Sequence, residues 1–272
     1  MASPAEMKIT QLARLIGTPE CPTIVDVRTD EDFGDDPRLI PGARRHAHAE
    51  TASLAQSLAG AKVLIYCQKG LKLSQGVAAI LRAQGIAAET LDGGQFAWRD
   101  AGLPMVESAK LPERNAQGQT VWVTRHRPKI DRIACPWLIR RFVDPAAQFL
   151  YVEPGQVLAV ADRFNAVPFD IEDVFWSHRG AHCTFDTMIA EFGLRIDALD
   201  RLAVIVRGAD TNRHDLAPES AGLLAASLGL SRMYRDDLEQ LAAGMALYDS
   251  FYRWARDATD EGHDWPAAVS RG

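Results

Sequence analysis

The sequence predicts an α/β protein built from two domains, and two observations favour this class. The short apolar run Lys62–Tyr66 is followed by a glycine-containing loop and then by residues with helical periodicity, the order expected for strand, loop and helix. The chain also has 272 residues, enough for two hydrophobic cores, and the polar stretch 107–119 lacks apolar periodicity. We therefore expect domains at 1–106 and 120–272, with 107–119 as linker.

Hydrophobic spacing predicts the elements of the first domain in chain order. The β-branched run Lys62–Tyr66 suits a strand buried on both faces of a parallel sheet. Val77, Ile80 and Leu81 then recur at helical spacing, so a helix should follow from residue 74. The remaining expected elements are a helix within 7–20, a strand from Thr23, a strand over 86–91, and a turn at Gly93-Gly94 that leads into a short helix.

Cys67 is the leading candidate for chemistry in this domain. It follows the predicted strand directly, and ligands of open α/β sheets bind at the carboxyl ends of strands. The start of the next helix would present its positive dipole end and free N–H groups to the sulfur. Lys69 and Lys72 add positive charge, which also favours the thiolate. The alternative is a buried thiol that packs as a small hydrophobe.

The loop Cys67–Ser74 resembles the active-site loop of rhodanese-type sulfurtransferases. Further segments resemble signatures of that family in the same order: Thr23–Arg28, Leu39–Ala43, Asp92–Gly94 followed by Trp98, and Gly102–Pro104. The resemblance covers about residues 8–106. It implies a doubly wound parallel sheet and an enzyme in which Cys67 takes a sulfane sulfur from a donor and holds it as a persulfide.

The same resemblance implies which residues bind the substrate. They are Gln68, Lys69, Gly70, Leu71, Lys72 and Leu73. The expected partners are a small-molecule sulfur donor such as thiosulfate and a thiol acceptor. Phosphatases of this fold have a loop one residue longer, closed by an arginine six positions after the cysteine. That position is Leu73 here, which disfavours phosphoryl transfer.

Composition indicates a globular protein of a reducing compartment. The net charge of −6 argues against general nucleic-acid binding. The four cysteines are widely spaced without a CxxC pair, and residues 1–6 have neither the basic start nor the apolar core of a signal peptide. No apolar run approaches the length of a membrane-spanning helix. We therefore expect a cytoplasmic protein with free thiols and no membrane partner; its oligomeric state stays open.

The second domain opens with a predicted strand at 120–124 and a basic segment at 125–141, in which six lysines or arginines stand against one acid. Proline is tolerated in the first turn of a helix, so Pro136 predicts a helix that starts, or restarts after a kink, near Cys135. A thiol at a positive dipole end among cations suits an oxyanion site or a reactive thiolate. A solvated helix face is the ordinary alternative. Near the C-terminus, apolar residues from Leu238 to Ala255 predict a long amphipathic helix.

The segment Lys129–Phe142 closely resembles the opening motif of the C-terminal domain of ChrB-type chromate-resistance proteins. The match continues through Phe149–Val152, Pro168–Ile171, Ser177–Gly180, Cys183–Asp186 and Ile205–Asp210, over about residues 120–256. It implies a helix-rich, mixed α/β domain with a role in chromate resistance or its sensing. In ChrB-type regulators a different N-terminal region, thought to serve DNA recognition, precedes this domain. The rhodanese-like module in its place favours thiol transfer over transcriptional regulation.

Two groups of polar residues in this domain could converge on a metal. Histidine, cysteine and carboxylate side chains gather within 178–186 and again within 210–219, although their spacing fits no standard zinc pattern. His178, Asp210 and Glu219 fall at motif positions of the resembled family and are the expected ligands of a divalent transition metal. Polar loop and cap roles explain such residues equally well.

Three functional hypotheses follow. The first is a sulfurtransferase linked to chromate resistance or oxyanion stress, with Cys135 as a second thiol that could accept sulfur or electrons from Cys67. The second is a chromate- or oxyanion-responsive sensor or regulator with a non-catalytic rhodanese module. Its candidate anion partners are Arg125, Lys129, Arg132, Arg140 and Arg141. The third is a DNA-binding regulator, which an acidic chain without a recognisable DNA-binding motif disfavours.

Overall fold

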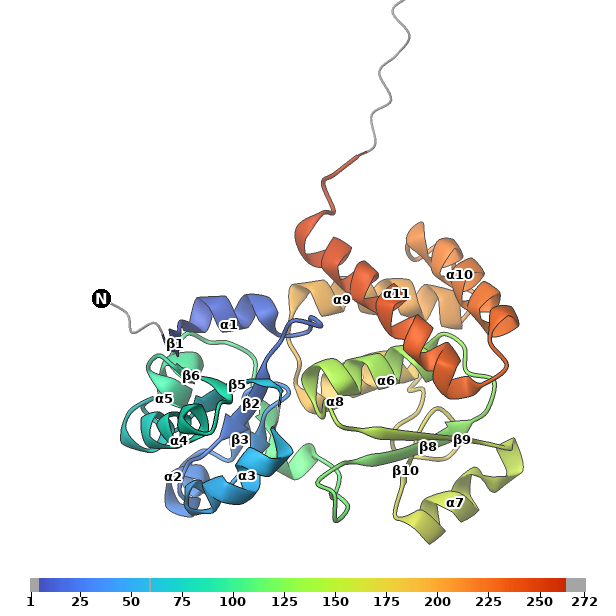
Figure 1. Ribbon diagram of the computed structural model, residues 1–272. Coiled ribbons are helices and arrows are strands. Elements are labelled where there is room, and N and C mark those ends of the chain that lie inside the picture. Colours follow the sequence, from blue (N-terminus) through green and yellow to red (C-terminus); the bar gives the residue numbers. More distant parts are fainter. Residues whose placement is uncertain (1–4, 59, 263–272) are drawn as a thin grey trace, which may run out of the picture.

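The computed structural model describes residues 5–58 and 60–262 and shows two α/β units side by side (Figure 1). The first unit contains a five-stranded parallel sheet of order β1-β6-β5-β2-β4. Its strands are β1 (Glu6–Met7), β2 (Thr23–Asp26), β4 (Arg44–Arg45), β5 (Lys62–Tyr66) and β6 (Ala87–Leu91). Its helices are α1 (Ile9–Leu15), α2 (Asp30–Asp35), η1 (His48–Glu50), α3 (Thr51–Ser57), α4 (Lys72–Ala83) and α5 (Gly94–Asp100). A separate antiparallel pair joins β3 (Arg38–Leu39) to β7 (Val106–Glu107).

Helices cover both faces of the five-stranded sheet because alternate side chains of each strand point to opposite sides. Val63 and Ile65 of β5 pack in one cluster with residues of α3 and α4. Leu64, which lies between them, packs in a second cluster that includes Leu12 of α1 and Trp98 of α5. This arrangement confirms the predicted doubly wound parallel sheet.

The second unit is built on a three-stranded parallel sheet of order β10-β8-β9. Its strands are β8 (Val121–Arg125), β9 (Gln148–Val152) and β10 (Val167–Pro168). The other elements that follow β7 are η2 (Ser108–Lys110), α6 (Asp131–Phe142), η3 (Pro154–Gln156), α7 (Val157–Phe164), α8 (Thr184–Phe192), α9 (Asp197–Asp210), α10 (Glu219–Met233) and α11 (Asp237–Asp257). Helix α6 lies on one face of the sheet and α7 on the other (Figure 1). The predicted helix-rich, mixed α/β second domain is confirmed.

Helix α6 is the centre of the second unit and packs against α8, α9 and α11. It begins at Asp131, four residues before the predicted start, so Pro136 lies inside it. Proline has no N–H to donate to the carbonyl oxygen of Arg132, one turn earlier. The hydroxyl of Tyr151 in β9 donates to that oxygen at 2.9 Å instead. The proline is therefore accommodated by a partner from a distant strand.

The two units share one hydrophobic core rather than meeting only through the linker. Residues of the first sheet and of α6 belong to the same buried cluster. The Gly42 amide donates to the carbonyl oxygen of Phe142 at 2.7 Å. A Cβ on Gly17 would lie 2.4 Å from the Phe142 ring and 2.8 Å from the ring of Tyr252 in α11. The first unit and α6 are thus in direct contact.

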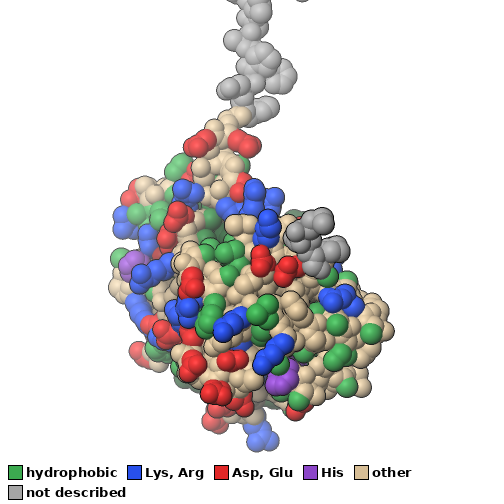
Figure 2. Space-filling view, turned by 90° about the vertical axis from the view of Figure 1, so that its left-hand side faces the viewer, with side chains coloured by type: hydrophobic (Ala, Val, Ile, Leu, Met, Phe, Trp, Pro, Cys, Tyr) green, Lys and Arg blue, Asp and Glu red, His purple; other side chains and the backbone are tan. Residues whose placement is uncertain are grey.

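Surface charge and helix length give two further observations. Acidic and basic side chains are interspersed on the face that the first unit turns outward (Figure 2). Within residues 5–58 and 60–262, no helix combines the length and the apolar character needed to cross a lipid bilayer.

Candidate functional site

Cys67 lies at the carboxyl end of β5, in the loop that leads into α4. It is buried, and its Sγ lies 3.3 Å from the Oγ of Ser74 in the first turn of α4. The same hydroxyl lies 3.1 Å from the carbonyl oxygen of Leu71. A serine hydroxyl has one proton and can also accept. Ser74 can therefore donate to a thiolate at Cys67, or accept from a thiol there while donating to Leu71.

The start of α5 holds the backbone of this loop. The amides of Gln95 and Phe96 donate to the carbonyl oxygens of Cys67 and Gln68, each at 3.0 Å. Within the described part of the chain, the amide N–H groups of residues 68–71 have no hydrogen-bond acceptor. Successive free amides of this kind bind anions in other proteins. The loop thus has donors available for a bound anion.

Two glycines allow the loop and α5 to approach each other. Gly70 has φ +71° and Gly94 has φ +61°. A Cβ on Gly70 would lie 2.5 Å from the carbonyl oxygen of Leu91. A Cβ on Gly94 would lie 2.4 Å from the carbonyl oxygen of Cys67 and 2.4 Å from the nitrogen of Gly70. The loop geometry therefore requires glycine at both positions.

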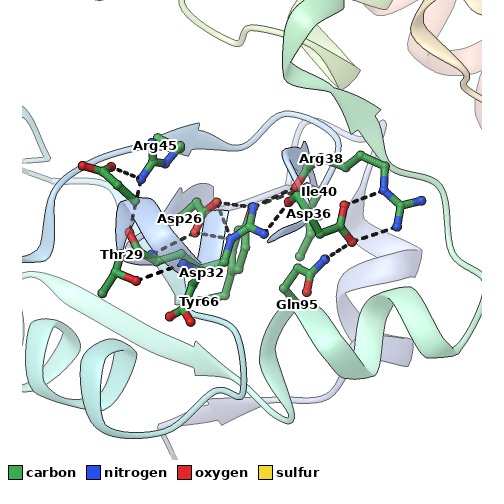
Figure 3. Close-up of polar contacts among 11 residues, drawn as sticks. Asp26, Thr29, Asp32, Asp36, Arg38, Ile40, Arg45, Tyr66 and Gln95 are labelled. Atoms are coloured by element: carbon green, nitrogen blue, oxygen red, sulfur yellow. Dashed lines mark hydrogen bonds and ion pairs between the residues drawn. The ribbon is translucent and has the colours of Figure 1, made fainter. Parts of the chain in front are cut away.

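A buried ion pair between Asp26 and Arg28 fixes the segment that follows β2 (Figure 3). Arg28 donates to the Asp26 carboxylate at 2.7 Å and to the carbonyl oxygens of Asp36 and Arg38 at 2.8 Å. The Asp36 carboxylate accepts from the side chain of Gln95 at 2.7 Å, and hydrogen bonds from Arg38 lower its pKa. The backbone amide of Gln95 also donates to the carbonyl oxygen of Cys67. This network therefore connects the end of β2 to the Cys67 loop.

Of the predicted substrate-binding residues, Gln68–Leu71 form the loop after β5, and Lys72 and Leu73 begin α4. Lys69 and Lys72 are exposed at its rim, and Gly70 is buried. Leu73, at the position that the related phosphatases fill with arginine, is half-buried in the first turn of α4. The arrangement places two cations beside the free amides.

A second polar cluster surrounds His178 in the second unit. The Nε2 atom of His178 lies 3.1 Å from Oδ2 of Asp210, 3.5 Å from Oδ1 of Asp170 and 3.6 Å from Oδ2 of Asp131. Asp131 is in the first turn of α6, Asp170 follows β10, and Asp210 ends α9. Three carboxylates, two of them distant from His178 in the sequence, therefore converge on one imidazole nitrogen.

Burial and charge alter the protonation of this cluster. Hydrogen bonds with Asp170 and Asp210 raise the pKa of His178 to about 10. Burial, followed by the negative charges of Asp210 and Asp170, raises the pKa of Asp131 well above its usual range. Both shifts favour the protonated forms of His178 and Asp131 at neutral pH.

The structure places two of the three predicted metal ligands, His178 and Asp210, in this cluster. Glu219 begins α10 instead and is not part of it. The atoms that converge within 4.8 Å of one another belong to Asp131, Asp170 and His178. Sequence reasoning did not name Asp131 and Asp170 because it considered only the groups within 178–186 and 210–219. A usable signal was that Asp131 is the single acid in a basic segment.

The five cations predicted to bind an oxyanion do not gather at one site. Eight residues of helix separate Arg132 from Arg140, a rise of about 12 Å along α6. Four of the five have partners within the protein, and Lys129 is exposed. The pairs are Arg125 with Asp170, Arg132 with Asp170, Arg140 with the ring of Phe149, and Arg141 with Asp249.

Comparison with known families assigns both units. Residues 8–101 match the model of the rhodanese-like domain, and residues 122–255 match that of the ChrB C-terminal domain. The chain joins a rhodanese-like domain to a ChrB domain. Protein ChrB of Cupriavidus metallidurans is 32% identical over an alignment of 193 residues, and the match covers 65% of this chain and 57% of that protein. The match thus spans little more than half of that relative's length.

Solved structures resemble the chain over about a third of its length. A rhodanese-like domain protein from Staphylococcus aureus is 29% identical, covers 34% of this chain and 89% of its own, and has a TM-score of 0.31. Thiosulfate sulfurtransferase from Pseudomonas aeruginosa is 27% identical, covers 38% of this chain and 19% of its own, and has a TM-score of 0.32.

Cys135, predicted as a reactive second thiol, is enclosed in the ChrB domain. Cys135 lies inside α6 and is fully buried, as is Cys183 before α8. Burial and the nearby Asp131 carboxylate raise the pKa of both thiols. The prediction of a reactive Cys135 at a helix N-terminus is wrong because α6 starts at Asp131. A relay of sulfur from Cys67 to Cys135 therefore lacks an accessible acceptor.

Alkylation should report this burial. We expect iodoacetamide at pH 8 to modify Cys135 and Cys183 in the native chain at least about tenfold more slowly than in the denatured chain, because the buried thiols are neither reachable nor ionised. Peptide mapping by mass spectrometry measures each site, with the denatured chain as the control in which all four cysteines react. Labelling of Cys135 as fast in the native chain as in the denatured chain would contradict the burial.

Proposed function

We propose that this chain is a sulfurtransferase that carries sulfane sulfur as a Cys67 persulfide and acts in chromate resistance or oxyanion stress. The observation that carries the proposal is the loop itself. Cys67 lies beside a serine hydroxyl, and the four residues that follow it have amides without an acceptor in the described chain. The rhodanese-like domain supports a group-transfer role at this position.

The proposed reaction has two transfers. The Cys67 thiolate attacks the outer sulfur of thiosulfate, a new S–S bond forms, and sulfite leaves with the electron pair of the broken S–S bond. An acceptor thiolate then attacks the outer sulfur of the persulfide, and Cys67 leaves as thiolate. In the first step negative charge moves from the Cys67 sulfur to the leaving sulfite, and in the second step it returns to the Cys67 sulfur. The free amides and the two lysines are suited to stabilise that charge.

The second domain and the cysteines support the proposed cellular role and location of the reaction. The ChrB domain and the relative named Protein ChrB support a role in chromate resistance. All four cysteines are unpaired, which fits a reducing compartment, and the proposal includes a cytoplasmic location. Sulfur delivered to a cellular thiol would add to the reduced sulfur available under oxyanion stress.

Mass spectrometry of the intact chain tests the proposal. After incubation with thiosulfate and removal of excess donor, we expect the mass to rise by one sulfur, with the added atom on the peptide that contains Cys67. The expected result for Cys67→Ser is no gain in mass and no sulfur transfer to cyanide or to a thiol.

The matched control is Cys21→Ser, which removes a half-buried thiol outside the loop. We expect this variant to load sulfur at the wild-type rate, because Cys21 has no part in the reaction. A wild-type chain that gains no sulfur, or a Cys67→Ser chain that still transfers it, would refute the sulfurtransferase function.

A further inference from the structure

We infer that the ChrB domain binds one divalent first-row transition metal ion between Asp131, Asp170 and His178, with Asp210 as a fourth ligand. This site is separate from the Cys67 loop, and the inference does not depend on sulfur transfer. Three carboxylates and one imidazole converge there from α6, the segment after β10, the loop before α8, and the end of α9.

The distances favour a shared cation over a simple ion pair with histidine. The three carboxylate oxygens lie 3.1, 3.5 and 3.6 Å from the same atom, Nε2 of His178. That nitrogen carries at most one proton, which can serve one carboxylate well. Ligand atoms bound at about 2.1 Å to one ion are separated by roughly 3.0–3.4 Å, close to the distances from Nε2. The ligand atoms of Asp131, Asp170 and His178 also lie within 4.8 Å of one another, so one metal ion can bind these three residues together.

The carboxylate of Asp131 points independently to an absent ligand. Asp131 is fully buried. Its Oδ2 atom accepts from the amide of Thr184 at 2.6 Å and faces His178, but its Oδ1 atom has no hydrogen-bond partner among the described residues. A buried carboxylate oxygen without a partner costs free energy unless a cation or a proton is present. Coordination of the ion by this carboxylate would remove that cost.

The surroundings resemble the outer shell of a metal site. The other oxygen of Asp170, Oδ2, lies 3.3 Å from both Arg125 and Arg132, and Oδ1 accepts from the hydroxyl of Thr184 at 2.9 Å. Such contacts orient metal-binding carboxylates. The side chain of His178 is 42% exposed, which leaves a solvent side for ion entry and water ligands. Carboxylates suit Mn²⁺ and imidazole suits Fe²⁺ and Zn²⁺, so an ion of this group fits the mixed set.

Titration of the chelator-stripped, full-length Cys67→Ser chain with Mn²⁺, and separately with Zn²⁺, tests the site. The serine removes the loop thiol as a competing ligand. We expect one equivalent to bind by calorimetry and by elemental analysis after desalting. Asp131→Asn, Asp170→Asn and His178→Gln should each weaken binding at least about tenfold. Because His178 lies partly exposed on a loop, His178→Gln should keep the fold even if a variant of the buried aspartates does not.

Asp173→Asn is the matched control. It removes an exposed carboxylate from the same loop, and asparagine also tolerates the positive φ of +59° at this position. We expect it to bind the ion with wild-type affinity. The inference is overturned if neither ion binds stoichiometrically, if His178→Gln binds as tightly as the parent chain, or if Asp173→Asn weakens binding as much as His178→Gln.

Discussion

Gly94→Ala is expected to slow persulfide formation at Cys67 about a hundredfold or more. The new Cβ would lie 2.4 Å from both the Cys67 carbonyl oxygen and the Gly70 nitrogen, so the loop must move away from α5. Misplacement of a reacting group by about 1 Å can cost roughly 10²-fold in rate. The measurement is the rate of sulfur loading from thiosulfate, followed by mass spectrometry of the intact chain.

Gly102→Ala separates this effect from backbone strain. Gly102 has φ +67°, close to that of Gly94, but a Cβ there would meet no atom within 4 Å. Both substitutions therefore add a similar left-handed strain of about 1–2 kcal/mol, and only one pushes on the loop. We expect Gly102→Ala to load sulfur at nearly the wild-type rate. Equal losses in the two variants would show that strain, and not loop position, limits the reaction.

Arg28→Met is expected to lower the free energy of unfolding by about 3–5 kcal/mol. The guanidinium is fully buried and bonds the Asp26 carboxylate and two carbonyl oxygens. Its removal leaves a buried carboxylate without a counter-charge, while methionine fills much of the volume. The urea midpoint of the full-length chain, followed by circular dichroism, measures the loss.

Arg253→Met is the corresponding surface control. Arg253 pairs with Asp257 one turn later on α11, and both side chains are exposed. Exposed pairs of this kind contribute little to stability because water screens them. We expect the urea midpoint of this variant to equal that of the wild type. If Arg28→Met also unfolds at the wild-type midpoint, the buried pair does not stabilise the domain.

Three strands and three helices of the rhodanese-like domain, β2, β5, β6, α1, α4 and α5, were predictable because their signals are local. The run Lys62–Tyr66 forms β5 as expected, and the helix after the loop begins at Lys72, two residues before the predicted start. The long C-terminal helix, α11, is also confirmed over the predicted stripe. The contacts that hold the loop were not predictable, since Gln95 bonds the loop through its backbone amide and bonds Asp36 through its side chain, and no sequence pattern pairs these segments.

The ChrB domain shows where local rules fail. Proline predicts a helix start because it cannot donate to the preceding turn, yet Pro136 lies inside α6 and the Tyr151 hydroxyl serves the freed carbonyl. That partner lies on β9, and no residue near the proline in the sequence indicates it. The cluster around His178 was half predictable for a similar reason. All four residues lie in segments that resemble the ChrB family, but Asp131 and Asp170 fall outside the two groups at 178–186 and 210–219, and only the fold shows that they face His178.

The close contact at Gly17 bears on what the linker, residues 107–119, contributes to the arrangement of the two domains. Rings of Phe142 and Tyr252 occupy the space that a side chain at residue 17 would need, so apolar packing already sets the orientation of one half against the other. The connecting segment therefore does not set that orientation alone, although its Lys110 and Arg114 pair with Glu191 and Asp144. The absence of a side chain at position 17 cannot change without matching changes on α6 and α11.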